Sequence, residues 1–139
     1  MNIEEKAKSL LKIRPHHSKE LERKLLMRRF NREQITGLIE QFNADGFLND
    51  EQFGQLYLDE LLRTKTFGFY GLKAKLMSRG IDGNDAERLL KENLSLEMEK
   101  EIARRVVERV GKIDKVKLTQ KLSRKGFRGD VIREVISKE

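Results

Sequence analysis

The sequence of 139 residues contains no cysteine, no tryptophan and one proline. Without cysteine it has no disulfide framework, thiolate metal site or cysteine nucleophile. Its two histidines, His16 and His17, are adjacent, so a dispersed histidine-based site is excluded. No apolar run exceeds three residues, whereas a membrane span needs about 20. No apolar signal core follows the opening Met-Asn-Ile-Glu-Glu-Lys, so we expect a cytoplasmic chain that makes no membrane contact.

Charged and helix-forming residues are abundant instead. Asp, Glu, Lys and Arg make up 38% of the chain, and 30 Lys and Arg against 23 Asp and Glu give a net charge of +7. Leu, Lys, Glu and Arg all favour the helix. This composition predicts an all-α protein that meets an anionic partner.

A sequence pattern recurs three times, at 24–30, 75–81 and 121–127. Each copy has Lys-Leu, two further residues, a base, one residue and a bulky apolar residue. The residue before the bulky one is Gly80 or Gly126 in two copies and Arg29 in the first. Glycine takes the left-handed conformation that ends a helix at little cost, so Arg29 is a weaker stop.

Apolar residues at helical spacing flank each copy and predict one helix before it and one after it. Asn31, Asn49, Asp82 and Ser95 are suitable N-caps, while Glu97, Glu99 and Glu101 follow Ser95 near the positive end of its helix. We therefore predict three tandem three-helix repeats, at residues 1–47, 48–94 and 95–139, with short links at 43–46 and 65–71. Units too small to bury their own faces must stack, which predicts an elongated, curved array.

No residues combine into a catalytic or metal-binding pattern. The serines lack a histidine partner pattern, and two neighbouring imidazoles without clustered carboxylates are weak evidence for a metal. We therefore expect no enzyme activity, metal or cofactor. Phe67, Phe69 and Tyr70 could stack on nucleic acid bases, but packing between helices is favoured for them.

The basic residues carry a stronger signal. The net charge is +3 over residues 1–49, −1 over 50–94 and +5 over 95–139. Bases also recur at two matching positions four residues apart, so each pair shares one helix face. These positions hold Lys24 and Arg28, Lys75 and Arg79, and Lys121 and Lys125. A row of such faces suits a phosphate backbone or an acidic protein groove. Cations that complement helix dipoles explain the same pattern equally well.

Two segments, Gly46-Phe-Leu-Asn-Asp-Glu-Gln-Phe-Gly54 and Gly71-Leu-Lys-Ala-Lys-Leu-Met-Ser-Arg-Gly-Ile81, resemble the RecX family of bacterial regulatory proteins. Arg14 and the run from Glu20 to Leu25 are similar to that family's opening motif. The resemblance implies a protein of DNA repair, recombination and the SOS response. Such a protein binds the RecA filament on single-stranded DNA, lies along its groove and suppresses strand exchange, ATP hydrolysis and coprotease activity.

The leading hypothesis is therefore a monomeric RecA inhibitor that occupies the filament groove and blocks filament extension. The alternative is a sequence-independent nucleic-acid-binding helical module. For the RecA inhibitor, the sequence leaves open whether inhibition requires direct contact with DNA. The candidate residues for partner or nucleic acid binding are Arg28, Tyr57, Arg63, Lys73, Lys75, Arg79, Lys121, Arg124, Lys125 and Arg128.

Overall fold

The computed structural model describes residues 1–138 and confirms the all-α prediction. Within these residues it contains nine α-helices and no strand. The helices are α1 (Ile3–Ile13), α2 (Ser18–Met27), α3 (Arg32–Asp45), α4 (Asp50–Thr64), α5 (Phe69–Ser78), α6 (Gly83–Asn93), α7 (Leu96–Val110), α8 (Lys115–Arg124) and α9 (Gly129–Ser137).

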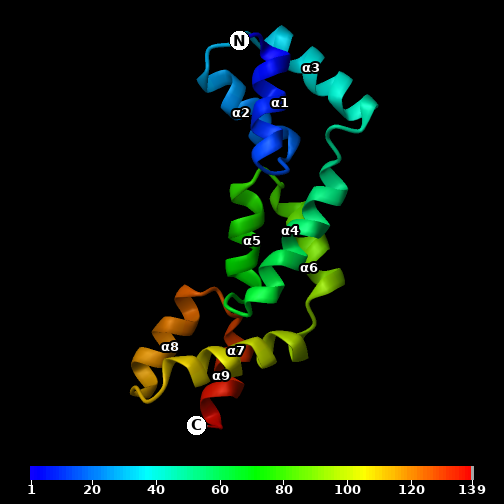
Figure 1. Cartoon of the computed structure of the whole chain (residues 1–139). Helices are drawn as coiled ribbons and strands as arrows, with labels where there is room; N and C mark the ends of the chain where they lie inside the picture. Colours follow the sequence, from blue (N-terminus) through cyan, green and yellow to red (C-terminus); the bar gives the residue numbers. More distant parts are fainter. Residues whose placement is uncertain (139) are drawn as a thin grey trace.

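The helices pack in three consecutive groups, which we call the first group (α1–α3), the second group (α4–α6) and the third group (α7–α9). Figure 1 shows the groups following one another along an elongated, bent molecule with the termini at opposite ends. The boundaries expected from the sequence, 1–47, 48–94 and 95–139, stay predictions.

The helix ends follow the sequence closely. The side chains of Asn31, Asn49, Asp82 and Ser95 each accept a hydrogen bond from the backbone N–H three residues later, as N-caps do. After the middle helix of each group the chain adopts the left-handed conformation, with φ of 103° at Gly80, 82° at Gly126 and 67° at Arg29. The three copies therefore share one backbone turn, although only two of them use glycine.

The bounds of two predicted links were wrong: the first lies at 46–49 in the structure, and the second is shorter than predicted. Helix α3 continues to Asp45, because the left-handed residue that stops it is Gly46, at φ 83°. Helix α5 already begins at Phe69, which leaves 65–68 as the link before it. Its early start depends on Glu99, which accepts a hydrogen bond from the Phe69 N–H and so replaces the side-chain cap that Gly68 lacks.

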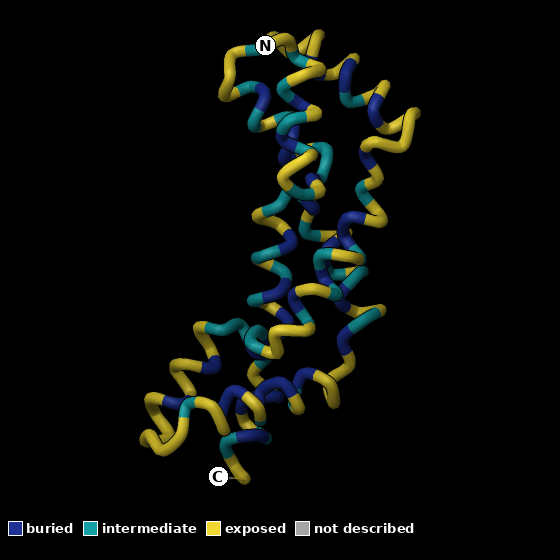
Figure 2. Tube along the Cα trace, in the orientation of Figure 1, coloured by how far each residue is buried: buried dark blue, intermediate teal, exposed yellow. Residues whose placement is uncertain are grey.

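The buried apolar residues form two separate cores (Figure 2). One core lies between Ala7 and Leu48, within the first group and its link to α4. The other runs from Phe53 to Val135 and is shared by the second and third groups. The second and third groups are therefore joined by common apolar packing, whereas the core of the first group is separate from that of the second.

Neighbouring groups meet through the same pair of segments each time. In the first joint, the start of α2 lies against the α5–α6 turn, where a Cβ on Gly80 would be 3.1 Å from the Lys19 Cβ. In the second joint, the start of α5 lies against the α8–α9 turn. There the Gly68 N–H donates to the Lys125 carbonyl at 3.1 Å and the Tyr70 N–H to the Gly126 carbonyl at 2.8 Å.

A carboxylate from the next group lies in each joint. Glu99, fully buried, accepts hydrogen bonds from the Phe69 N–H at 3.1 Å, the Arg128 N–H at 2.9 Å and Arg128 Nε at 2.6 Å. Neither α5 nor α9 has a side-chain cap of its own, so this single carboxylate caps both. In the first joint, Asp50 accepts from the Ser18 N–H at 2.8 Å and from its hydroxyl at 3.1 Å.

Replacing Gly126 with alanine should open the second joint. The new Cβ would lie 1.9 Å from the Gly71 nitrogen, so backbone would have to move. Gly46 is a matched control, since its φ of 83° equals that of Gly126 within one degree but no atom lies within 4 Å of its Cβ position. We expect Gly46→Ala to cost about 1–2 kcal/mol from the left-handed backbone alone. We expect Gly126→Ala to cost about 1–3 kcal/mol more from overpacking. Urea unfolding measures both, and equal losses would contradict the joint.

Candidate functional site

The first joint brings together cations from two groups. Lys24 of α2 is half-buried, and its Nζ lies 2.9 Å from His16 Nε2. Burial lowers the pKa of Lys24, and the positive charges of Arg14, Arg79 and Arg28 lower it further against the opposing charge of Glu20. Arg79, from the second group, therefore lies within electrostatic reach of Lys24 in the first. The Arg79 guanidinium also stands 4.7 Å from the centre of the Tyr57 ring.

In the second joint, cations from two groups lie at the same aromatic ring. Lys75 of α5 places its Nζ 4.5 Å from the centre of the Phe67 ring, and Lys125, at the end of α8, places its Nζ 5.8 Å from it. Both distances are within the range of cation–π attraction. One ring thus gathers a cation from the second group and one from the third.

The two recurring basic positions therefore meet across the joints. Arg79 of the second group lies within electrostatic reach of Lys24 in the first, and Lys75 of the second group shares the Phe67 ring with Lys125 of the third. The sequence predicted a row of equivalent helix faces, which stays a prediction; in the structure, cations from neighbouring groups come near one another at both joints. We call these two pairs the cross-joint pairs.

The third group adds a different basic surface on α8. Lys121 and Arg124 are exposed there and line a shallow hollow together with Ile113, Lys117, Gln120 and Lys125. Between Lys112 and Lys125 the sequence holds six Lys or Arg residues and one acid, Asp114. None of these six cations forms an ion pair with another described residue.

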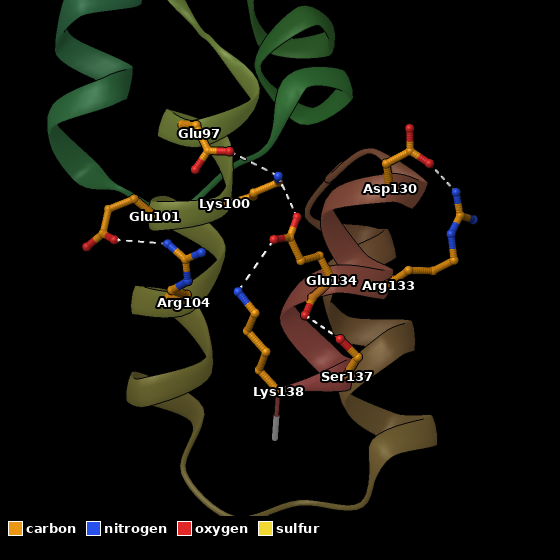
Figure 3. Close-up of polar contacts among 9 residues, drawn as sticks. All are labelled: Glu97, Lys100, Glu101, Arg104, Asp130, Arg133, Glu134, Ser137 and Lys138. Atoms are coloured by element: carbon orange, nitrogen blue, oxygen red, sulfur yellow. Dashed lines mark hydrogen bonds and ion pairs between the residues drawn. The ribbon is translucent and has the colours of Figure 1, made fainter.

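Most charges on α7 and α9 are paired instead (Figure 3). Lys100 lies between Glu97, at 3.1 Å, and Glu134, which also pairs with Lys138 at 3.5 Å. The hydrogen bond from Lys100 lowers the pKa of Glu134. The net charge of the third group is therefore displayed mainly on α8.

The other candidate residues are scattered. Arg28 is exposed at the end of α2, where its Nη1 donates to the Lys24 carbonyl at 3.3 Å, and Arg63 is exposed in the last turn of α4. Lys73 lies 3.4 Å from the Glu87 carboxylate. Arg128 is held by Glu99 and stands 4.5 Å from the Phe69 ring centre, so within this chain it helps to build the second joint.

Some residues that matter here carried little signal in the sequence. Glu99 was expected beside Glu97 and Glu101 as a helix-dipole charge, yet it alone of the three is buried. Lys117 completes the α8 surface but lies outside the recurring pattern. Packing was confirmed for Phe69, which is 4% exposed, and was wrong for Tyr70, whose ring is 56% exposed because only its backbone meets the Gly126 turn.

Within residues 1–138 no three His, Cys, Asp or Glu side chains gather closely enough to hold a metal ion. Over the same residues, no helix has the length and apolar character needed to cross a membrane.

Both histidines lie in the first joint as neutral rings. His16 donates from Nδ1 to the Arg14 carbonyl at 2.9 Å, so its Nε2 accepts from Lys24. His17 caps α2 by accepting from the Lys19 N–H at 3.0 Å. Burial lowers the pKa of each ring. The hydrogen bond to Arg14 opposes this shift at His16, and the charge of Asp50 opposes it at His17.

The first joint should therefore weaken in mild acid. A histidine whose folded pKa is depressed favours folding above its unfolded value of 6.5, and that contribution is lost as the pH falls below it. We expect the free energy of unfolding to drop between about pH 7 and pH 5.5. His17→Asn keeps the cap without the titration, because asparagine is a strong N-cap. It should show a smaller drop in urea unfolding, and an unchanged drop would contradict the role of His17.

Comparisons with known proteins place the chain among one kind of regulatory protein. No family model matches it. The protein named regulatory protein RecX of Trichlorobacter lovleyi is 28% identical over 138 residues, which cover 93% of this chain and 90% of that protein. The protein of the same name in Pelodictyon phaeoclathratiforme is 35% identical over 86 residues, 62% of this chain and 54% of that protein.

Solved structures of RecX proteins are also similar to this chain. The crystal structure of RecX from Lactobacillus salivarius matches with a TM-score of 0.82 and 25% identity, covering 96% of this chain and 92% of that one. A second crystal structure, of regulatory protein RecX, also has a TM-score of 0.82 and covers 99% of this chain and 72% of that one. At 19% identity, this second likeness concerns the fold alone.

Proposed function

The chain belongs to the RecX family of regulatory proteins, and on that premise we propose that it binds RecA filaments on single-stranded DNA and inhibits them. Binding along the filament groove would block filament extension and suppress recombinase, ATPase and coprotease activity. The chain would then act in the cytoplasm, as a monomer, in the control of DNA repair, recombination and the SOS response. Inhibition would come from occupying the groove, so it requires no catalytic residue of this chain.

The observation that carries the proposal is the recurrence of the cross-joint pairs. Lys24 with Arg79, and Lys75 with Lys125, lie at equivalent places of an elongated array. A filament offers the same surface repeatedly, so equivalent contacts can bind successive protomers. Several weak contacts on one chain add through effective concentration, which gives tight binding without any strong single contact.

The α8 surface supports the alternative function of a sequence-independent nucleic-acid-binding module. Its cations, including Lys121 and Arg124, are exposed and have no ion-pair partner among the described residues. Such a surface would bind phosphates directly, and the logarithm of the affinity for single strands would fall with the logarithm of salt concentration by about 0.7 per phosphate contacted.

Charge reversal should separate the two functions. We expect Lys75→Glu with Lys125→Glu to weaken inhibition of the RecA ATPase on single-stranded DNA by about tenfold or more. The two new carboxylates would face the expected anionic surface of the partner, and like charges across an interface are strongly unfavourable. Lys121→Glu with Arg124→Glu should chiefly weaken binding to DNA alone. Arg32→Glu with Lys91→Glu is the matched control. It changes the net charge equally, at two exposed residues that have no ion-pair partner among the described residues.

The assay has clear contrary outcomes. If the wild-type chain at stoichiometric concentration leaves RecA ATPase activity unchanged, the RecA proposal fails. If binding to naked DNA is tight and RecA makes no difference to it, the nucleic-acid-binding module is the better account. If the Lys75 and Lys125 variant inhibits as well as the control, the cross-joint pairs are not the contact surface.

A further inference from the structure

A small hollow, which we call the Tyr57 hollow, lies beside the Tyr57 ring at the first joint. Besides Tyr57 its lining includes Arg14 from the link before α2, Phe53 and Leu56 from α4, and Arg79 from the end of α5. Its volume is about 170 Å³, below the roughly 300–1,000 Å³ of small-molecule sites. The hollow therefore has room for a side chain rather than for a cofactor.

One wall of the hollow is apolar and partly open. Phe53 is 7% exposed and stacks on Tyr57, with the ring centres 5.7 Å apart. Leu56 lies on the same helix and is 55% exposed. An apolar side chain entering the hollow would remove this leucine surface from water, which is favourable.

The charge beside this wall is positive and unpaired. The Arg79 guanidinium stands 4.7 Å from the centre of the Tyr57 ring and forms no ion pair with another described residue. Lys24 and Arg28, whose charges act on each other in the same joint, form no ion pair among the described residues either. Glu60 is the one acid in the lining and is exposed. The joint therefore attracts a carboxylate to Arg79.

A protein segment suits this hollow better than a nucleic acid base. Base stacking uses the face of an aromatic ring. Tyr57 already stacks on Phe53 and has Arg79 over its ring, so a base that stacked there would have to displace one of them. An aliphatic side chain can lie against Leu56 and leave both contacts intact.

We propose that the Tyr57 hollow binds one aliphatic side chain of an acidic protein segment, and that a carboxylate next to that side chain pairs with Arg79. An apolar anchor in a small pocket beside an arginine is typical of the strongest contacts in protein interfaces. The inference rests on the proposed function in one respect, which is that RecA carries the segment. The Tyr57 hollow would then give the first joint a specific anchor beside its basic residues.

A peptide experiment tests the chemistry of the hollow without RecA. The probes are the end-blocked peptides Asp-Asp-Leu-Asp-Asp and Asp-Asp-Ser-Asp-Asp, and the readout is the NMR signal of the Leu56 methyl groups in the full chain. We expect the leucine peptide to shift these signals saturably and the serine peptide to bind about tenfold more weakly, because it lacks the apolar anchor. Arg79→Gln should weaken binding of the leucine peptide by about tenfold, because a charged hydrogen bond is lost.

Binding to RecA filaments on single-stranded DNA tests the carrier of the segment. Leu56→Ala should weaken this binding by about tenfold, as truncation of an anchor residue does. Leu96→Ala is the matched control, since it is the same substitution at a residue that is 44% exposed at the start of α7. It should bind as the wild-type chain does. Binding to naked single-stranded DNA should be the same for both variants.

The contrary outcomes are separate for the two arms. Unshifted Leu56 signals, or equal affinity for the two peptides, would overturn the inference. Weaker binding of Leu56→Ala to naked DNA would also overturn it, because a nucleic acid would then be the occupant. If the wild-type chain binds filaments and Leu56→Ala binds them as well as Leu96→Ala, the hollow is not the anchor for RecA. If the leucine peptide binds as expected but the wild-type chain does not bind filaments, the proposed function fails and the chemistry of the hollow is supported.

Discussion

One buried carboxylate, that of Glu99, joins the start of α5 in the second group to the start of α9 in the third, beside the apolar core that the two groups share. Burying a charge costs several kcal/mol unless hydrogen bonds satisfy it. Glu99 accepts three, from the start of α5 in the second group and from the backbone and side chain of Arg128 at the start of α9. Neither α5 nor α9 has another side-chain cap, so the first residues of both helices lie beside the Glu99 carboxylate. That placement in turn brings Lys75 and Lys125 to the same aromatic ring.

The first joint reaches a similar geometry by different chemistry. Asp50 binds the start of α2 there, and neutral histidines take the places that Phe67 and Gly68 hold in the second joint. The first group also keeps a core of its own, whereas the other two share one. The array thus has one connection in which two groups share an apolar core and one connection that contains both histidines.

Local features of the fold could be predicted from the sequence, and contacts between groups could not. Caps such as Asn31 and Ser95 and turns such as Gly126 depend on neighbouring residues alone, so their chemistry is visible in the chain. Glu99 is different, because Glu97 and Glu101 look the same in sequence and only tertiary packing decides which one is buried. The cross-joint pairs could not be predicted, because they depend on how whole groups pack together. The spacing of residues along a helix does not indicate that packing.

The central claim is that the geometry of the joints, rather than total charge, governs the proposed inhibition of RecA. Its most direct test compares how strongly Glu99→Gln and Glu97→Gln inhibit the RecA ATPase. Each variant removes one negative charge from a chain of net charge +7, but Glu97 is exposed and Glu99 is buried in the second joint. The account predicts that Glu99→Gln inhibits more weakly than the wild-type chain while Glu97→Gln inhibits at least as well. If both variants inhibit the RecA ATPase as strongly as the wild-type chain or more strongly, charge alone explains binding and the account is contradicted.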